Sequence, residues 1–402
     1  MSSKSKGKST GKGKGTGKSL LGNTETATRK TTKKTPKVAV VVSSGRRHCV
    51  YAPAPRWLPY SEEVRLSGSK ASPEEVYDDA LSEARTGTNQ HIGQRKLLIS
   101  EVQLLTTWYA SARVAKGGAP HPVLVYVGAA PGSHDIFLHR LFPHVKFVLY
   151  DGAPFDDRLR LNPATFELRN EYFTDAHCAE LVRRTAQGAP GPLAGRPLLF
   201  VCDIRSDAAD DDGFETQVMR DMLSQRRWAE ALRPELSLLK FRLPYTLSDV
   251  PGATVPYLKG RLLWGVWATR DSGETRLLVK KADVRKTVEY DYSAYEGAKT
   301  FHNHYTRRVC FSDAVPAELS NLVSGPENAY CSCFDCLTEL VTYKKYLETA
   351  SGNAGGPFRT VEEIARAYNN DRGSMRFPMA NKAAPAARPI ERFPLAKKPV
   401  KG

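Results

Sequence analysis

The chain has 402 residues, 41% of them hydrophobic, which suits one large globular domain or two smaller ones. Its formal net charge of +16 comes from two tails, because residues 1–38 hold eleven Lys or Arg against one Glu, residues 376–402 hold seven against one, and residues 39–375 are neutral. The positive net charge therefore does not indicate a basic groove on the folded domain. No segment has the roughly eighteen apolar residues of a membrane span and no signal peptide opens the chain, so we expect no membrane association.

Both tails are expected to be disordered. Residues 1–38 consist largely of Lys, Gly, Ser and Thr, and the chain from about residue 376 is basic and rich in Pro, so neither can bury much apolar surface. Such arms are attracted to polyanions by counterion release, although a solubilising tail or a localisation signal is an equally good interpretation. Residues 39–74 mix short apolar runs with Pro and Gly and are predicted to be irregular.

The first predicted elements are two helices. The stretch "SPEEVYDDALSEA" begins at Ser72, a favourable N-cap that is followed by a proline at the first helical position. Residues 88–115 then place Leu98, Val102 and Leu105 at spacings of three to four. This spacing predicts an amphipathic helix.

Short apolar runs follow, each separated from the next by helical or loop sequence: "PVLVYV", "VKFVLY", "PLLFVC" and "LSLLKF". Runs that are apolar on both faces and alternate with helices indicate a mainly parallel sheet covered on both sides. Further on, "RLLWGVWATR" and "ETRLLVKK" flank "DSG", a plausible hairpin turn. We therefore predict one α/β domain over residues 75–350 whose sheet has an antiparallel end, with 351–402 as a C-terminal extension.

The cysteines bear on compartment and metal binding. Seven cysteines without the spacing of a disulfide framework argue for a reducing compartment. In "CSCFDC", Cys331, Cys333 and Cys336 could offer three thiolates to zinc. No second cluster accompanies them and a predicted helix begins inside the motif, so we favour the absence of a metal site.

A glycine turn follows the first strand. "VYVGAAPGSHD" has the pattern of a strand, a tight turn and a helix, which places a ligand at the carboxyl end of the strand. Gly128 and Gly132 are separated by three small residues rather than in the G-x-G-x-x-G spacing that binds a pyrophosphate. Asp151, at the end of the second strand, can accept both hydroxyls of a ribose. These features favour S-adenosyl-L-methionine over NAD, while a purely structural loop stays open.

Four charged residues lie at predicted strand ends or on the first amphipathic helix. They are Lys96 on that helix, Asp203 after "LLFVC", Lys240 at the end of "LSLLK" and Glu274 at the start of "ETRLLV". Carboxyl ends of parallel strands converge beside the ligand crevice, so two lysines and two carboxylates could meet there. A buried lysine must be paired or lose its proton, and a neutral lysine is a usable general base. The alternative is an ion-pair network that only fixes the sheet.

Six blocks carry a resemblance to a known family. In chain order, "GQRKLLISE", "VYVGAAPGSH", "VLYDG", "VCDIRS", "LLKFRLPY" and "SGETRLL" are similar to the poxvirus cap-specific mRNA (nucleoside-2′-O-)-methyltransferase family, whose members also serve as the small, regulatory subunit of a poly(A) polymerase. The likeness runs from about Tyr77 to about Leu347. It implies a Rossmann-like S-adenosylmethionine-dependent methyltransferase from a large DNA virus.

The resemblance also implies roles for individual residues. The family's catalytic Lys–Asp–Lys–Glu tetrad falls on Lys96, Asp203, Lys240 and Glu274. Its cofactor-binding positions fall on Gln94, Tyr126, Gly128, Gly132, His134 and Asp151. The family has an arginine two positions after that aspartate, and here Ala153 replaces it, so one cofactor contact is missing or replaced.

The family also holds the 7-methylguanine of the cap between two aromatic rings and reads its edge with carboxylates. The rings fall on Tyr77 and Tyr245, and one carboxylate falls on Glu296. The second carboxylate is out of register, because Leu247 stands in its place and Asp249 lies two residues further on. A packing tyrosine at 77 and a surface charge at 296 are the ordinary alternatives.

We therefore expect methyl transfer from S-adenosylmethionine to the 2′-hydroxyl of the first transcribed nucleotide of capped mRNA, with Lys240 taking the hydroxyl proton. Two alternatives stay open: a non-catalytic RNA-binding subunit of a poly(A) polymerase, and an rRNA 2′-O-methyltransferase. The expected partners are capped mRNA and, in a regulatory role, a poly(A) polymerase catalytic subunit. The expected location is the virion and host cytoplasm for a viral protein, and otherwise the soluble interior of the cell.

Overall fold

The computed structural model describes residues 50–51, 89–111, 120–206, 211–248, 250–269, 272–304, 307, 309–310, 315–324, 330 and 333–371. All of them belong to one unit that spans residues 45–402. The helix expected from Ser72 and both basic tails lie outside the described residues. None of the helices in the described ranges combines the length and apolarity that a membrane crossing requires.

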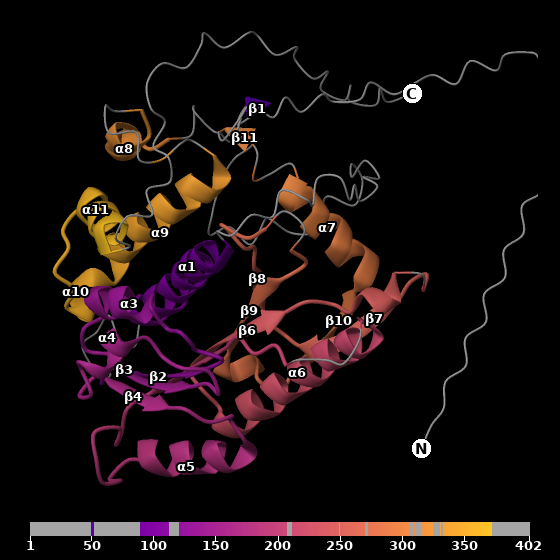
Figure 1. The fold of residues 1–402 in the computed structure, drawn as a ribbon, viewed down its shortest axis with the longest axis horizontal. Helices are drawn as coiled ribbons and strands as arrows, with labels where there is room; N and C mark the ends of the chain where they lie inside the picture. The colour runs from indigo at the N-terminus through magenta and orange to yellow at the C-terminus, as the bar shows by residue number, and fades with distance from the viewer. Residues whose placement is uncertain are drawn as a thin grey trace, which may run out of the picture. The chain divides into compact units, whose positions relative to one another are not determined.

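A seven-stranded sheet organises the described residues (Figure 1). Its strand order is β4-β3-β2-β5-β6-β9-β8, with β4 to β6 parallel and β9 antiparallel to both of its neighbours. The five parallel strands follow the doubly wound order of a Rossmann-like fold, which confirms the predicted fold class. The strands are β2 Val123–Val127, β3 Lys146–Tyr150, β4 Phe166–Arg169, β5 Leu198–Cys202, β6 Leu236–Phe241, β8 Arg261–Leu263 and β9 Thr275–Lys280.

The central strands are apolar on both faces because each face lies under helices. Along β2, Leu124 and Tyr126 contribute to one core, and Val123 and Val125 contribute to the other, as the alternation of side chains along a strand requires. Helices α1, α3, α9 and α11 form the first core, and α5 and α6 form the second (Figure 1). These helices are α1 Asn89–Tyr109, α3 Asp135–Leu141, α5 Asp175–Thr185, α6 Asp211–Leu232, α9 Phe334–Thr349 and α11 Val361–Asp371.

The remaining elements are short or lie at the edge of the sheet. Strands β7 and β10 form an antiparallel pair, and β1 and β11 form a parallel pair. Their bounds and those of the other elements are β1 Val50–Tyr51, β7 Thr254–Leu258, β10 Thr287–Asp291, β11 Val309–Cys310, α4 Asp157–Arg160, α7 Tyr292–His304, α8 Ser320–Ser324, α10 Ser351–Ala354, η3 Tyr245–Leu247, η4 Lys281–Asp283 and η7 Ala317–Leu319.

The structure agrees with the predicted helices where it describes them. The helix expected over 88–115 is observed as α1, and α9 begins inside "CSCFDC", with Cys333 as its N-cap. The first core continues past the predicted domain limit at residue 350, since Ile364 and Tyr368 of α11 are buried in it. The limit at 350 stays a prediction, and helical chain beyond it packs on the domain.

The expected hairpin turn at "DSG" is wrong in its extent. Strand β8 ends at Leu263 and β9 starts at Thr275, so a long segment connects them. Two buried contacts draw this segment out of the sheet: the Trp267 indole donates to Glu339 Oε2 at 2.8 Å, and His302 bonds the carbonyl of Gly265 at 3.0 Å. Trp267 has a φ of 58°, a left-handed conformation that a β-strand cannot contain. Tertiary contacts therefore override the strand pattern of "WGVWATR".

A buried network around Glu339 joins this segment to α1 and α9. The Glu339 carboxylate accepts hydrogen bonds from Arg95 Nε at 2.6 Å, the Trp267 indole at 2.8 Å, and the hydroxyls of Tyr330 at 2.9 Å and Tyr343 at 3.2 Å. The guanidinium of Arg95 lies 3.9 Å from the centre of the Trp267 ring. Both charges are thus taken out of water as a hydrogen-bonded pair, and both oxygens of the carboxylate accept hydrogen bonds.

Glu339→Ala should destabilise the fold by about 3–5 kcal/mol, because it leaves the Arg95 charge buried without its partner. Glu339→Gln should cost less, since the amide oxygen still accepts hydrogen bonds. The measurement is chemical denaturation, with Glu235→Ala as the control, since it removes an exposed pair with Lys281 and should cost less than about 1 kcal/mol. Equal losses for Glu339→Ala and Glu235→Ala would contradict the role assigned to the network.

A second prediction concerns pH. Burial, with help from Lys299 and Arg307, lowers the pKa of His302 from its ordinary 6.5 to about 3. Between these two pKa values the unfolded chain protonates His302 and the folded chain does not. The contribution of this residue to the free energy of unfolding is therefore fully present above pH 6.5 and is lost as the pH falls toward 3. This group alone should remove about 2 kcal/mol between pH 7 and pH 5. Unfolding curves of His302→Gln should show a smaller loss over this interval; parallel losses would contradict the prediction.

Candidate active site

The glycine turn after β2 lies directly against the end of β5. Gly128 has a φ of 79°, and a Cβ placed on it would lie 2.9 Å from the carbonyl carbon of Asp203. The Asp203 amide also donates to the carbonyl of Val127 at 2.9 Å. A side chain at 128 would therefore be both strained and obstructed. This close approach brings the predicted cofactor turn and a predicted catalytic carboxylate into one site.

Asp151 fastens the glycine turn to the end of β3. Its Oδ2 accepts the amide of Ala130 at 2.9 Å, and its Oδ1 accepts the amide of Ala153 at 2.8 Å. The side chain of Asp151 is only partly buried, and each oxygen keeps further acceptor capacity. A carboxylate held in this way at a strand end suits the two hydroxyls of a ribose.

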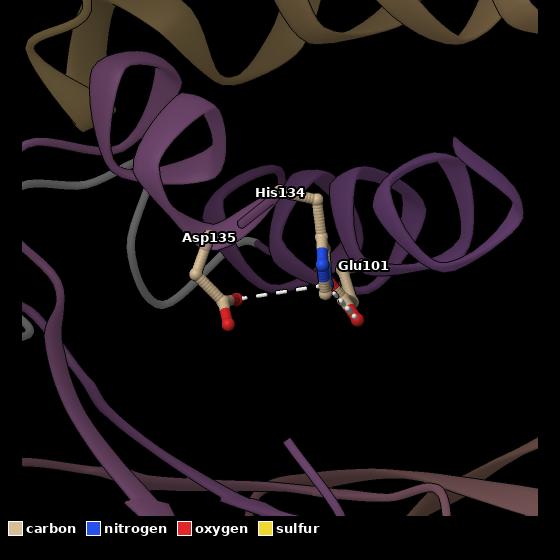
Figure 2. A group of neighbouring side chains, drawn as sticks. All are labelled: Glu101, His134 and Asp135. Atoms are coloured by element: carbon tan, nitrogen blue, oxygen red, sulfur yellow. Dashed lines mark hydrogen bonds and ion pairs between the residues drawn. The ribbon is translucent and has the colours of Figure 1, made fainter. Parts of the chain in front are cut away.

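Gln94 and His134 also meet, across α1 and the start of α3. The His134 Nδ1 lies 2.7 Å from Gln94 Oε1. On the other side of the ring, Nε2 lies 2.9 Å from Glu101 Oε2 (Figure 2). Asp135 Oδ1 lies 3.7 Å from the same Nε2. Burial alone would lower the pKa of His134, but Glu101 and Asp135 outweigh it and raise the pKa to about 9. The imidazolium therefore ties α3 to α1 beneath the glycine turn.

The four predicted catalytic residues converge. Lys240 Nζ lies 3.2 Å from Asp203 Oδ1 and 3.3 Å from Glu274 Oε1. Lys96 Nζ lies 3.4 Å from Glu274 Oε2. Their side chains keep between 11% and 21% of their surface exposed, so the group opens to solvent at one edge. Lysines and carboxylates alternate in one connected arrangement at the carboxyl ends of β5 and β6.

Two arginines that sequence reasoning missed complete this group. Arg276 Nη2 donates to Asp203 Oδ1 at 2.6 Å, and Arg205 Nη2 donates to Glu274 Oε1 at 3.0 Å. Arg276 stands opposite Lys240 in the antiparallel pairing of β6 and β9 and two residues after Glu274, so strand alternation alone puts it on the same face. We call the two arginines with Lys96, Lys240, Asp203 and Glu274 the strand-end cluster.

The strand-end cluster holds four basic groups against two carboxylates. Burial lowers the pKa of Lys96, and the neighbouring charge of Arg276 lowers it further, against the pull of Glu274 and Asp203. Burial would raise the pKa of Glu274, but Lys240, Lys96 and the two arginines outweigh it and hold that pKa well below the usual range. The Glu274 carboxylate therefore stays ionised, and the surrounding positive charge favours release of a proton from Lys96.

A further lysine, on α7, is connected to the cluster through hydrogen bonds. Lys299 is 1% exposed, and its Nζ donates to Asn303 Oδ1 at 3.1 Å. Asn303 in turn donates to the carbonyl of Ser272 at 2.9 Å, and the Ser272 hydroxyl accepts the amide of Glu274 at 3.3 Å. Burial, with Arg307 and Lys96, lowers the pKa of Lys299 to about 7. In the sequence, the spacing of Glu296, Lys299 and Asn303 already places these three residues on one face of a helix, and this pattern could have indicated the group.

The described cap candidates lie together beyond the end of β6. Arg242 covers one face of the Tyr245 ring at 4.2 Å from its centre, and Glu215 accepts the Tyr245 amide at 2.7 Å while also bonding Arg242. Burial and the nearby Glu296 charge raise the pKa of Tyr245. Burial likewise raises the pKa of Glu296 to about 7, and its buried Oε1 has no hydrogen-bond partner among the described residues.

Two positions discussed for cap binding lie outside the described residues: Tyr77 and Asp249. Leu247, which stands in the place of the expected second carboxylate, ends the η3 turn. Glu215 is a carboxylate near Tyr245 that the sequence did not reveal, because it comes from α6, but both of its oxygens already accept hydrogen bonds.

Curated relatives match part of the chain. The cap-specific mRNA (nucleoside-2′-O-)-methyltransferase of Fowlpox virus (strain NVSL) is 28% identical over 180 residues, or 43% of this chain and 53% of the relative. The protein of the same name from Myxoma virus (strain Lausanne) is 25% identical over 192 residues, or 47% of this chain and 52% of the relative. The match thus spans about half the length of each relative.

A solved structure of human methyltransferase-like protein 13 in complex with SAH aligns with 54% of this chain and 91% of that chain, at 14% identity and a TM-score of 0.23. The fold assignment therefore rests on the strand order and not on this alignment. The model of one family, described as poly A polymerase regulatory subunit, matches residues 65–346. That range covers the whole sheet, the glycine turn and the strand-end cluster. The chain belongs to the poly A polymerase regulatory subunit family.

Proposed function

We propose that this protein is a cap-specific mRNA 2′-O-methyltransferase that uses S-adenosylmethionine. The observation that carries the proposal is the convergence of Lys96, Asp203, Lys240 and Glu274 beside the glycine turn, with Gly128 packed on the backbone of Asp203. A network that only fixed the sheet would have no need to stay partly open to solvent. The names of the Fowlpox and Myxoma virus relatives support the same activity.

The residues present fit this cofactor. The turn from Gly128 to Gly132 has small apolar side chains and no pyrophosphate spacing, which suits an adenosine without phosphates. Asp151 would hold the ribose hydroxyls. The Tyr126 hydroxyl is buried beneath the turn without a hydrogen-bond partner among the described residues, so a polar ligand group has a donor to meet. Gln94 and His134 would support the turn from α1.

Bound cofactor supplies an electrophilic methyl group on a positively charged sulfur. The chain's own residues then orient the acceptor hydroxyl and remove its proton. Lys240 Nζ, held 3.2 Å from Asp203 and 3.3 Å from Glu274, is positioned as the group that takes the proton. Lys96 holds the other oxygen of Glu274, and the two arginines neutralise the carboxylates so that neither becomes the competing base. Catalysis is therefore mostly positioning with one proton transfer.

Recognition of the cap would use Tyr245 and Glu296. Arg242 covers one face of the Tyr245 ring and the residue is 39% exposed, so a base would stack on the opposite face. Glu296 offers a buried carboxylate oxygen without a partner among the described residues, which suits the hydrogen-bond donors on a guanine edge. Tyr77 would supply the second ring. The substrate would thus be capped mRNA, and a poly(A) polymerase catalytic subunit is the proposed protein partner, in keeping with the family.

Two other functions compete with this proposal. A non-catalytic regulatory subunit would keep the fold but would have no use for the complete tetrad. An rRNA 2′-O-methyltransferase would use a similar tetrad but would have no use for a Tyr245–Glu296 pocket. Transfer of labelled methyl groups to capped, uncapped and already 2′-methylated RNA separates the three. We expect transfer to capped RNA alone. Transfer to uncapped RNA would contradict the proposal that the enzyme is specific for the cap.

Lys240→Ala and Lys240→Arg should both lose nearly all methyl transfer while still binding S-adenosylhomocysteine. Alanine removes the accepting amine, and arginine keeps the charge but stays protonated at any accessible pH. Single-turnover rates and calorimetric binding measure the two effects separately. Lys280→Arg, an exposed lysine at the far end of β9, is the matched control and should keep the wild-type rate. Substantial turnover by Lys240→Arg would show that another group takes the proton.

Tyr245→Ala should weaken binding of a 7-methylated cap more than that of an unmethylated cap. Methylation makes the purine cationic, and stacking of a cation on an electron-rich ring adds about 0.5–2 kcal/mol, or about 2- to 30-fold in affinity. Tyr245→Phe should have a mild effect because it keeps the ring. Titration of both cap analogues against each variant measures the difference. Equal losses for both caps in Tyr245→Ala would remove Tyr245 from the cap site.

A further inference from the structure

Three ionisable side chains are buried together beside the glycine turn. Glu101 comes from α1, and His134 and Asp135 come from the start of α3 (Figure 2). Their side chains are at most 1% exposed, and one nitrogen or oxygen atom from each lies within 4.8 Å of the others. We call these three residues the buried triad. The proposed methyl transfer assigns no task to Glu101 or Asp135.

The hydrogen bonds within the buried triad leave Asp135 without a donor. His134 Nδ1 lies 2.7 Å from Gln94 Oε1, and its Nε2 lies 3.1 Å and 2.9 Å from the two oxygens of Glu101. A protonated imidazole has only these two N–H groups. Asp135 Oδ1 lies 3.7 Å from Nε2, and neither oxygen of Asp135 accepts a hydrogen bond from a described residue. A buried carboxylate in this state is unfavourable until a positive charge or a proton reaches it.

The lysines and arginines of the described ranges do not meet this need. Arg276 interacts electrostatically with Glu101, but it donates its hydrogen bonds to Asp203 and to the carbonyl of Thr275. No described lysine or arginine donates to the carboxylate of Asp135. With its imidazole neutral, the buried triad carries two negative charges, which an ion of two positive charges would balance.

The spacing of the ligand atoms suits zinc. Zinc binds nitrogen and oxygen at about 2.0–2.2 Å in a tetrahedron, so its ligand atoms lie about 3.3–3.6 Å apart. His134 Nε2 lies 2.9 Å from Glu101 Oε2 and 3.7 Å from Asp135 Oδ1, on either side of that range. Small side-chain rotations would therefore bring the three atoms onto one ion. An imidazole beside carboxylates also favours zinc over magnesium or calcium, which prefer oxygen ligands throughout.

We propose that the buried triad binds one zinc ion through Glu101, His134 Nε2 and Asp135. Zinc takes the place of the proton on Nε2, which leaves to solvent, and the proton on Nδ1 is donated to Gln94 Oε1. Histidines that bind zinc usually make a supporting hydrogen bond of this kind. The ion holds α1 against the start of α3 and takes no part in methyl transfer. The inference therefore does not depend on the proposed function.

The test compares the full-length chain with and without zinc. Chain that is stripped with EDTA and then dialysed against zinc chloride should hold about one zinc ion in this site. It should also unfold at a higher denaturant concentration than the stripped chain, because a ligand that binds only the folded state stabilises it. Magnesium chloride should give no comparable shift. An equal shift with magnesium, or no shift with zinc, would overturn the proposal.

Asp135→Asn separates metal binding from packing, because it keeps the shape of the side chain and removes its charge. Its zinc affinity should fall by more than the roughly 10- to 100-fold that loss of a supporting partner causes, and the zinc-dependent shift should disappear. Without zinc it should be at least as stable as the wild type, since a buried carboxylate without a donor is gone. Asp157→Asn is the matched control, because Asp157 also opens a helix, α4, but its side chain is 99% exposed. A shift of wild-type size in Asp135→Asn would contradict the site.

Cysteines are the competing zinc ligands in this chain, so the identity of the bound atoms must be measured. X-ray absorption at the zinc edge distinguishes sulfur from nitrogen and oxygen neighbours. We expect nitrogen and oxygen neighbours alone in the loaded wild-type chain. Sulfur neighbours would assign the zinc to cysteines and overturn the proposal, whatever the result of the methyl-transfer assay.

Discussion

The architecture of the site depends on the buried carboxylate of Glu339. It accepts hydrogen bonds from α1, from the segment between β8 and β9, and from two tyrosines, so three parts of the chain that are distant in sequence share one acceptor. Its partner Arg95 stands between Gln94 and Lys96 on α1. Holding Arg95 inward fixes the rotation of α1 and with it the directions of both neighbours. The orientation of the site residues on α1 therefore depends on a buried ion pair that lies outside the strand-end cluster.

In the strand-end cluster, too, each carboxylate is shared by more than one basic group. A lysine beside one ionised carboxylate would be held firmly as an ammonium ion. Here each carboxylate is already shared with an arginine, whose charge is permanent. The lysines consequently share their carboxylate partners with permanent charges, and Arg276 adds to burial in lowering the pKa of Lys96. The arginines adjust the chemistry without needing to contact the reacting atoms.

Sequence patterns predicted the parts of the structure that depend on local chemistry. The apolar runs, the amphipathic α1 and the turn between Gly128 and Gly132 were all recognisable because each follows from periodicity or from backbone requirements. The long segment before β9 was not recognisable, because the sequence around Trp267 predicts a strand and only its contact with Glu339 explains the observed conformation. The same limit applies to Glu215, which reaches the site from α6, and to the contact of Arg205 with Glu274, although Arg205 itself lies in the block "VCDIRS". Pairwise contacts between distant elements leave no trace in one sequence, whereas Arg276 did leave one through strand alternation.

The sheet also sets the distance between two parts of the site. Asp151 and Lys240 stand at the ends of β3 and β6, three strand steps apart in the order β3-β2-β5-β6. Each step is about 4.8 Å, so backbone hydrogen bonding sets a span of about 14 Å between the two strand ends. Side-chain replacements in the surrounding turns can alter how firmly a ligand is gripped, but they cannot rescale that span. The distance between these two strand ends changes only if a strand is added or removed, so the backbone holds the two functional turns of the site at a fixed separation.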